Sequence, residues 1–154
     1  MKHPLAPAVV AVCAALLLGA CGGGGDASPD EFRSQANKVC RDIEQQVDKI
    51  QQTLPVTAEQ AEKQADAIVD VSDQALSNLR KIDAPEELQA AYDRYLEKRE
   101  KAIEHVEKAR EAAADKDSGA YARAKRQLAA GQPTRRQAAL RLGLGSCSRP
   151  SLPS

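Results

Sequence analysis

The chain has 154 residues and carries 22 basic and 22 acidic side chains, so its formal net charge is zero. A balanced total charge gives no reason to expect nucleic acid or an anionic membrane surface as a partner. The length suffices for one domain with a modest core and leaves no room for a second independent domain. Aromatic residues make up only 3% of the sequence, whereas Ala, Glu, Gln, Lys, Arg and Leu are abundant, and this mixture favours helices over strands.

Residues 1–20 have the organisation of an export signal. A basic start precedes an apolar run over residues 5–17, which is too short for an ordinary membrane-spanning helix. Residues 18–21 have the sequence Leu-Gly-Ala-Cys, which resembles the lipobox of bacterial lipoproteins. The resemblance implies that the signal peptide is removed before Cys21 and that fatty acids on Cys21 anchor the chain to a membrane. The alternative is an ordinary leader with an incidental cysteine.

Residues 21–28 would then form the lipidated cysteine and a tether. The glycine run over residues 22–25 has no reason to fold, so it predicts a flexible spacer between the bilayer and the domain. We therefore expect the protein at the extracytoplasmic face of the cell membrane, with the membrane as a partner through the lipid on Cys21.

The first helix is predicted to begin at Pro29. Ser28 is a capping residue, proline suits the first helical position, and Glu31 can complete a capping box. Apolar residues then recur at steps of three and four until Leu54 and Pro55, where we expect the helix to end. This apolar stripe consists of Phe32, Ala36, Val39, Cys40, Ile43, Val47, Ile50 and Leu54.

Two further helices follow. Thr57 and Gln60 predict a capping box for the second helix. Pro85, Glu86 and Glu87 suit the first turn of the third, by geometry and by the helix dipole. The expected inward residues of the second helix are Ala61, Ala65, Ile68, Ser72, Ala75, Leu79 and Ile82. Those of the third are Leu88, Tyr92, Tyr95, Leu96, Ala102, Ile103, Val106, Ala109 and Ala113.

The fourth segment begins after a turn at residues 115–119. Residues 131–133 have the sequence Gly-Gln-Pro, which predicts a break or a sharp kink near Pro133. Thr134 and Gln137 could restart the helix as another capping box. Its expected inward residues are Tyr121, Ala124, Leu128, Ala138, Leu140 and Leu142.

Four helical segments joined by short corners favour antiparallel neighbours. We therefore predict an all-α fold, an up-down-up-down four-helix bundle over residues 29–147 with the fourth helix broken near Pro133. Gly143 and Gly145 are expected to end that helix, and residues 148–154 are expected to be a disordered tail.

The chain has four cysteines, of which Cys13 would leave with the leader and Cys21 would carry the lipid. Cys40 and Cys147 remain as the pair in an oxidising compartment, and a structural disulfide is the favoured interpretation. An up-down bundle brings its first and last helices together, so Cys147 can meet Cys40 if the chain folds back after Leu144. The alternative, redox-active or metal-binding thiols, lacks a Cys-x-x-Cys motif or paired histidines.

No set of residues has the pattern of a catalytic or metal site. His105, on the flank of the third helix, is expected at an edge of the bundle, since no partner for acid–base chemistry is evident. Ser72 is interpreted as a small core residue, because it lacks a nucleophile motif. Tyr92, Tyr95 and Tyr121 are expected to pack in the interior, with the floor of a ligand cleft as the alternative. We predict no catalytic residue, no metal and no cofactor.

Charge is distributed unevenly along the chain. All 22 acidic residues precede residue 118, and the C-terminal basic segment, residues 118–154, has no acid at all. Five acids of the second helix fall within an arc of about eighty degrees. This acidic face of the second helix and the two basic residues considered with it form a candidate interaction surface, namely Glu59, Glu62, Asp66, Asp70, Asp73, Arg135 and Arg136.

The favoured explanation of this charge pattern is structural, because a solvated acidic face can attract the basic segment and fix which helices are neighbours. The alternatives are a docking strip for a basic partner and a weak divalent-cation surface, although the usual calcium-binding loop is missing.

Three short motifs accompany the lipobox and the glycine tether. They are Ala-Asn-Lys-Val-Cys at residues 36–40, Ala-Pro-Glu-Glu-Leu at residues 84–88 and Leu-Gly-Leu-Gly-Ser-Cys at residues 142–147. With these motifs the chain resembles small uncharacterised lipoproteins of high-GC Gram-positive, actinobacterial type. The resemblance implies a disulfide-clasped helical domain and transfers no catalytic residue.

We therefore expect a non-catalytic lipoprotein with a protein-interaction or scaffold role in the envelope, and an envelope protein as its candidate partner. The alternative is a small-ligand-binding bundle whose cavity is lined by Tyr92, Tyr95 or Tyr121. An enzyme would need a convergent set of reactive groups that the sequence does not display.

Overall fold

The structure, a computed structural model, describes residues 28–149. This part of the chain is helical and contains no strand. The predicted signal peptide and all but the last residue of the predicted tether lie outside the described residues. The elements are α1 (Pro29–Ile50), α2 (Ala58–Arg80), α3 (Glu86–Ala114), α4 (Ser118–Arg141) and a short 3₁₀ turn, η1 (Ser146–Ser148).

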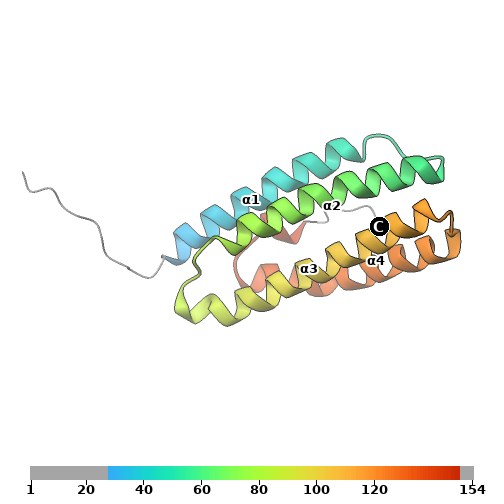
Figure 1. Cartoon of the computed structure of the whole chain (residues 1–154). Coiled ribbons are helices and arrows are strands. Elements are labelled where there is room, and N and C mark those ends of the chain that lie inside the picture. The colour runs from blue at the N-terminus through green and yellow to red at the C-terminus, as the bar shows by residue number, and fades with distance from the viewer. Residues whose placement is uncertain (1–27, 150–154) are drawn as a thin grey trace, which may run out of the picture.

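Consecutive members of the four long helices run antiparallel to each other (Figure 1). Backbone contacts join α1 to α2, α2 to α3 and α3 to α4, an arrangement consistent with the predicted up-down-up-down bundle. Between the described helices α1 and α4, however, no two Cα atoms lie within 8 Å of each other. The turn η1 contacts both helices instead, so it closes this side of the bundle at one end.

Polar side chains cap the first residues of three helices. The Ser28 hydroxyl accepts a hydrogen bond from the Glu31 N–H at 3.2 Å, and the Thr57 hydroxyl accepts one from the Gln60 N–H at 3.2 Å. Both caps confirm the predicted capping residues, but the predicted boxes are not completed, because Glu31 accepts from Gln35 and Gln60 accepts from the Val56 N–H instead of from the cap residues. At the start of α4, Asp117 Oδ1 accepts from the Ala120 N–H at 2.8 Å, a cap that the sequence analysis missed.

The first helix is shorter than predicted, because it ends at Ile50 instead of Leu54. Leu54 is 75% exposed, so its assignment to the apolar stripe is wrong. The Gln64 side-chain amide donates to the carbonyls of Ile50 at 3.0 Å and Thr53 at 2.9 Å, which satisfies backbone acceptors at this end. Pro55 also disfavours a helical conformation for the residue before it.

The core is uneven along the bundle. The buried aromatic side chains, those of Phe32, Tyr92 and Tyr95, gather at the end that contains η1, where the rings of Phe32 and Tyr92 pack edge to face with centroids 4.8 Å apart. The buried Tyr92 hydroxyl donates to the Leu79 carbonyl at 2.8 Å. The other half of the bundle is filled mainly by smaller aliphatic residues, namely Ala65, Ile68, Val69, Leu76, Ala102, Ile103, Val106 and Leu128.

The fourth helix is continuous through Pro133, so the predicted break is wrong. Proline removes only its own N–H, and the exposed position of Pro133 lets its ring face water. Side-chain donors serve carbonyls in the preceding turns: the Thr134 hydroxyl donates to Gly131 at 2.9 Å, and Arg135 donates to Leu128 at 3.4 Å. Thr134 therefore supports an existing helix and does not cap a new one.

A glycine turn ends α4 and reverses the chain. Gly143 has a φ of 77°, and the Leu144 N–H donates back to the Ala139 carbonyl at 2.9 Å, as in a Schellman motif. The turn buries Leu142 and Leu144 in the aromatic half of the core. By contrast, the predicted inward residue Leu140 is 53% exposed.

Candidate functional site

The end of the chain is fastened to α1 by a covalent link. The sulfur atoms of Cys40 and Cys147 lie at disulfide-bonding distance, and their Cα atoms are 5.0 Å apart. Both residues are buried in the aromatic half of the core. The pairing predicted from the sequence is therefore present, and the backbone reversal at Gly143 brings it about. Beyond Cys147, the side chain of Arg149 forms an ion pair with Glu44 of α1 at 3.5 Å.

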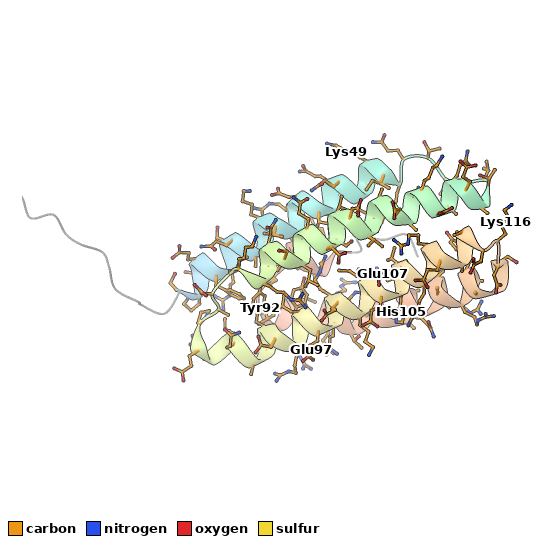
Figure 2. All side chains as sticks on the ribbon, in the orientation of Figure 1. Lys49, Tyr92, Glu97, His105, Glu107 and Lys116 are labelled. Atoms are coloured by element: carbon orange, nitrogen blue, oxygen red, sulfur yellow. A yellow bond between two sulfur atoms is a disulfide. The ribbon has the colours of Figure 1, made fainter. Side chains whose placement is uncertain are left out.

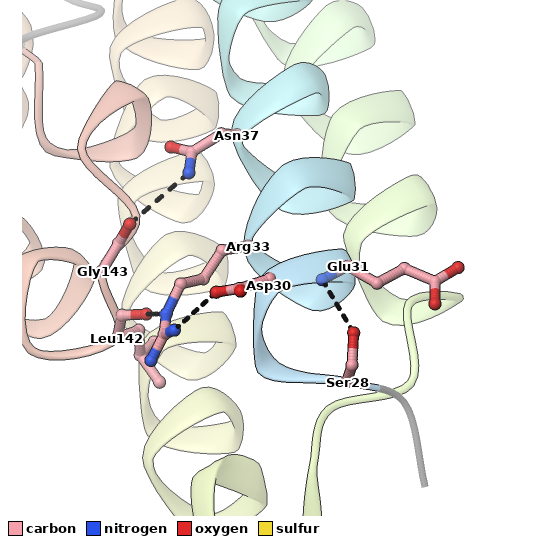
Figure 3. Close-up of polar contacts among 7 residues, drawn as sticks. All are labelled: Ser28, Asp30, Glu31, Arg33, Asn37, Leu142 and Gly143. Carbon is pink, nitrogen blue, oxygen red and sulfur yellow. Dashed lines mark hydrogen bonds and ion pairs between the residues drawn. The ribbon is translucent and has the colours of Figure 1, made fainter. Parts of the chain in front are cut away.

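Polar contacts between α1 and residues 142–146 accompany the disulfide, and Figure 3 shows those that reach Leu142 and Gly143. Arg33 Nε donates to the Leu142 carbonyl at 3.1 Å, and the Arg33 guanidinium also pairs with Asp30 at 3.3 Å. The Asn37 side chain donates to the Gly143 carbonyl at 3.5 Å, while its oxygen accepts from the Ser146 N–H at 2.8 Å. These bonds satisfy backbone groups that the end of α4 leaves without a helical partner.

The acidic face of the second helix, formed by its five acids and called the α2 acidic face from here on, lies on the surface of the bundle. Glu62 is half-buried, and the other four acids are exposed. Two of the five form ion pairs: Glu59 with Lys63 of the same helix at 2.7 Å, and Asp66 with Arg110 of α3 at 3.2 Å. Lys63 lowers the pKa of Glu59 by hydrogen bonding and by its charge. Among residues 28–149, no basic group lies within ion-pair distance of Glu62, Asp70 or Asp73.

The described part of the basic segment, residues 118–149, does not lie along this face, which corrects the structural explanation favoured from the sequence. No Cα atom of α4 lies within 8 Å of a Cα atom of α2 in the described bundle. The physical reason is the helix order, because the second and fourth helices of an up-down bundle are diagonal to each other. None of the ion pairs among the described residues includes Arg135 or Arg136.

The two arginines themselves have different surroundings. Arg136 is exposed, whereas Arg135 is half-buried. Arg135 lines a cleft between α3 and α4 with a volume of about 230 Å³, and it also borders a small interior cavity of about 30 Å³. The interior cavity is large enough for a water molecule and is lined by side chains of all four helices.

The three tyrosines divide into two kinds of environment. Tyr92 and Tyr95 are both 1% exposed and pack in the core, as expected (Figure 2 shows Tyr92). Tyr121 is half-buried and borders a cleft of about 260 Å³ at the opposite end of the bundle from η1. Only Tyr121 is therefore placed to contribute to a ligand cleft among these residues.

His105 lies on α3 and lines the cleft between α3 and α4 (Figure 2). The residue is half-buried, and its Nδ1 atom is buried without a hydrogen-bond partner among residues 28–149. Burial, followed by the charge of Lys108, lowers the pKa of His105. Both effects favour the neutral form of the His105 ring over the charged form.

The described residues were also compared with what metal binding, a serine nucleophile or a membrane-spanning helix would require. Within residues 28–149, no group of three or more His, Cys, Asp or Glu side chains is arranged to hold a metal ion. Ser72 is buried in the interior face of α2, in agreement with the prediction that it is a small core residue. None of the helices in the described part of the chain has an apolar stretch sufficient to cross a lipid bilayer.

In comparisons with known proteins, no protein-family model, curated protein sequence or solved structure matches the chain.

Proposed function

We propose that the chain is a membrane-anchored, extracytoplasmic lipoprotein whose helical bundle is a non-catalytic binding module. In this proposal the α2 acidic face docks an envelope protein with a basic surface. The observation that carries the proposal is that the C-terminal basic segment leaves this face uncovered. The internal role that would have explained the acids is thereby removed.

The acidic face has the electrostatic character of a docking surface. Glu62, Asp70 and Asp73 have no ion-pair partner among the described residues, so their charges act outward on the solvent. Exposed charges of this kind chiefly steer a partner of opposite sign and set its orientation, and they add little affinity individually. We therefore expect binding to weaken as salt concentration rises.

The position of the face in the bundle also suits a tethered protein. The lipobox-like sequence places the anchor before Pro29, where α1 begins, and α2 runs in the opposite direction to α1 (Figure 1). Glu59 thus lies at the end of the bundle far from Pro29, and Asp73 lies nearer to it. A face extending along the length of the domain would be open to an envelope partner above the bilayer.

Site-specific crosslinking in intact cells tests this proposal. A photo-crosslinking amino acid would replace Ser77, an exposed residue one helical turn beyond Asp73. With the wild-type acidic face, the crosslinker should capture a protein, and the double charge reversal Asp70→Lys with Asp73→Lys should abolish this capture. The control, Asp48→Lys with Glu111→Lys, makes the same change of charge at exposed positions on α1 and α3. Absence of capture, or equal capture with both charge reversals, would contradict the proposal.

A small-ligand-binding bundle is the second candidate function, and the cleft beside Tyr121 favours it. This cleft is lined largely by apolar groups, including Pro55, Val56 and Ala61, and Val56 is 84% exposed. An apolar ligand bound there would raise the melting temperature of the chain, by an amount that grows with the logarithm of the ligand concentration once this exceeds the Kd. The rise should disappear in Tyr121→Ala and Val56→Ser if the cleft is the site.

A further inference from the structure

The cleft between α3 and α4 has positively charged walls. It encloses about 230 Å³, and its charged residues are Lys98, Lys101 and Arg135 with one carboxylate, Glu97. These three cations and one carboxylate give the walls a net charge of two positive units, without counting His105. Figure 2 shows Glu97 and His105 on the helix that forms one wall. A cleft of this charge attracts small anions by focusing the field between its walls.

Arg135 is the most buried cation of this cleft, and the described residues give it no anionic partner. Its guanidinium donates only to the Leu128 carbonyl at 3.4 Å, a long hydrogen bond. The nearby Arg99 of α3, also half-buried, donates to the Tyr95 hydroxyl at 3.3 Å and likewise has no ion pair within residues 28–149. Burial, followed by the charge of Arg99, lowers the pKa of Arg135.

Two half-buried guanidinium groups that repel each other are costly unless an anion offsets their charge. The described bundle supplies no carboxylate within ion-pair distance of either Arg99 or Arg135. An anion from outside the chain would therefore gain both a charged partner and several N–H donors. Guanidinium groups suit oxyanions in particular, because their planar donors match the spacing of phosphate and carboxylate oxygens.

The backbone of α4 makes room for the Arg135 guanidinium. A Cβ atom added at Gly131 would lie 2.9 Å from Arg135 Nη1, so the absence of a side chain there lets the guanidinium lie against the helix. Gly131, the first residue of the Gly-Gln-Pro sequence that was expected to break the helix, therefore lines the cleft instead.

His105, which lines the same cleft, has a buried Nδ1 atom with no hydrogen-bond partner among residues 28–149. A buried nitrogen without a hydrogen bond is uncommon in folded proteins, and such atoms call for an explanation by water, ion or ligand. Since His105 lines the cleft, a bound molecule with polar atoms would lie close to this ring.

We propose that the cleft between α3 and α4 binds a phosphate group, held by Arg135 and Lys101 and bordered by His105. The net charge of the walls matches that of phosphate, which carries one to two negative units near neutral pH. Free inorganic phosphate and the phosphodiester of a lipid headgroup share this chemistry. The site is separate from the α2 acidic face, because α3 lies between α2 and α4.

Isothermal titration of the full chain at constant ionic strength tests the site, with inorganic phosphate and glycerophosphoglycerol as the two probes. Arg135→Gln and Lys101→Gln should each weaken binding by about tenfold or more. Arg136→Gln is the matched control, since it removes the same charge one residue away at an exposed position outside the cleft. Circular dichroism would establish that each variant is folded. Lys101 is exposed and forms no hydrogen bond in the described bundle, so its variant should keep the fold even if Arg135→Gln does not.

The probes separate the two sources. Tighter binding of inorganic phosphate indicates a free phosphate, and tighter binding of the diester indicates a headgroup, and either result supports the site. No binding of either probe to the wild-type chain would overturn the proposal. Equal weakening in Arg136→Gln would also overturn it, because the effect would then be one of surface charge.

The His105 ring provides a readout that surface charge would not reproduce. The groups whose charges act on it are Glu104, Lys101 and Lys108 of α3 and Arg135 of α4. A phosphate bound in the cleft would stabilise the protonated ring and raise the pKa of His105, as followed by NMR titration. An unchanged histidine titration at saturating phosphate would place the anion elsewhere and contradict the proposed site.

Discussion

At the scale of single residues, Gly143 controls how the chain returns from α4 to α1. Its φ of 77° lies in the region that favours glycine, and an added Cβ would lie 2.7 Å from Arg33 Nε. Arg33 donates to the Leu142 carbonyl from that position. A side chain at residue 143 would therefore strain the backbone and displace a hydrogen bond that fastens the chain end to α1.

Gly143→Ala should lower the free energy of unfolding by about 1 to 3 kcal/mol, from the left-handed conformation and the contact with Arg33. Urea denaturation measures this loss. Gly145→Ala is the matched control, because Gly145 has a φ of −58° and no heavy atom within 4 Å of its added Cβ. The control should be neutral or slightly stabilising. Equal losses in the two variants would contradict the special role of Gly143.

Cys21 is the residue on which the proposed location depends. If the Leu-Gly-Ala-Cys sequence at residues 18–21 acts as a lipobox, Cys21→Ala should abolish fatty-acid labelling in cells and leave the precursor uncleaved. Cys40→Ala tests the specificity of the label, since it leaves the lipobox intact. Unchanged labelling of the Cys21 variant would refute the lipid anchor.

Single-residue features were predictable where the signal is local. The caps at Ser28 and Thr57 follow from a capping residue placed before an apolar pattern, and both are present. Asp117 could have been found in the same way, because Asp is among the best capping residues and precedes a helical segment. The unpartnered nitrogen of His105 could not, since it depends on how tightly α4 packs against α3.

At the scale of elements, Pro133 tests what holds α4 together. Pro133→Ala should raise the free energy of unfolding by about 1 to 3 kcal/mol, because it restores a helical N–H and removes the ring from an exposed helix interior. Thermal and urea denaturation measure the change, and Gln132→Ala should be nearly neutral by comparison. A loss of stability in Pro133→Ala would mean that the local geometry around proline is needed to seat Leu142 and Leu144 in the core.

The order and type of the helices were predictable, but some of their limits were not. Apolar spacing identifies the inward face of each helix, and Phe32, Ile68 and Val106 are buried as expected. Leu54 continues the spacing of α1, yet Gln64 ends the helix from a different element. At Pro133 the local rule predicts a break, but the helix continues, and side-chain donors of α4 bond to the carbonyls of Gly131 and Leu128 nearby. In both places side chains make backbone hydrogen bonds that the apolar pattern does not reveal.

At the scale of the whole molecule, the disulfide closes a loop with a sequence separation of 107 residues. Cys40→Ala with Cys147→Ala should lower the free energy of unfolding by up to about 4 to 5 kcal/mol, because the unfolded chain regains the entropy of the open loop. Urea denaturation measures the loss. Ser146→Ala keeps the disulfide and should cost less than about 1 kcal/mol, since its contact with Arg41 is exposed. A negligible loss in the double variant would show that the polar contacts alone hold the chain end.

The uneven distribution of charge could be read from the sequence, but the helices that are neighbours in the fold could not be predicted from it. Opposite charges on the second and fourth helices suggested that the two helices attract each other, whereas the fold places them diagonally with α3 in contact with both. Hydrophobic burial determines the helix order, because exposed ion pairs contribute little to stability. The acids of α2 thus remain on the surface, and Arg135 lies in a cleft with no carboxylate within ion-pair distance among the described residues.

A double-mutant cycle tests most directly whether the α2 acidic face is free. It combines Asp66→Lys and Asp70→Lys with Arg135→Glu and Arg136→Glu, and urea denaturation gives the free energy of unfolding of each corner. Since α2 and α4 do not approach within 8 Å between Cα atoms, the two sets of changes should be additive to within about 0.5 kcal/mol. The pair of Asp66 and Arg110, 3.2 Å apart, is the positive control, with an expected coupling of about 0.2 to 1 kcal/mol. A coupling above about 1 kcal/mol between α2 and α4 would place the acidic face against the basic segment, and it would then not be available to a partner.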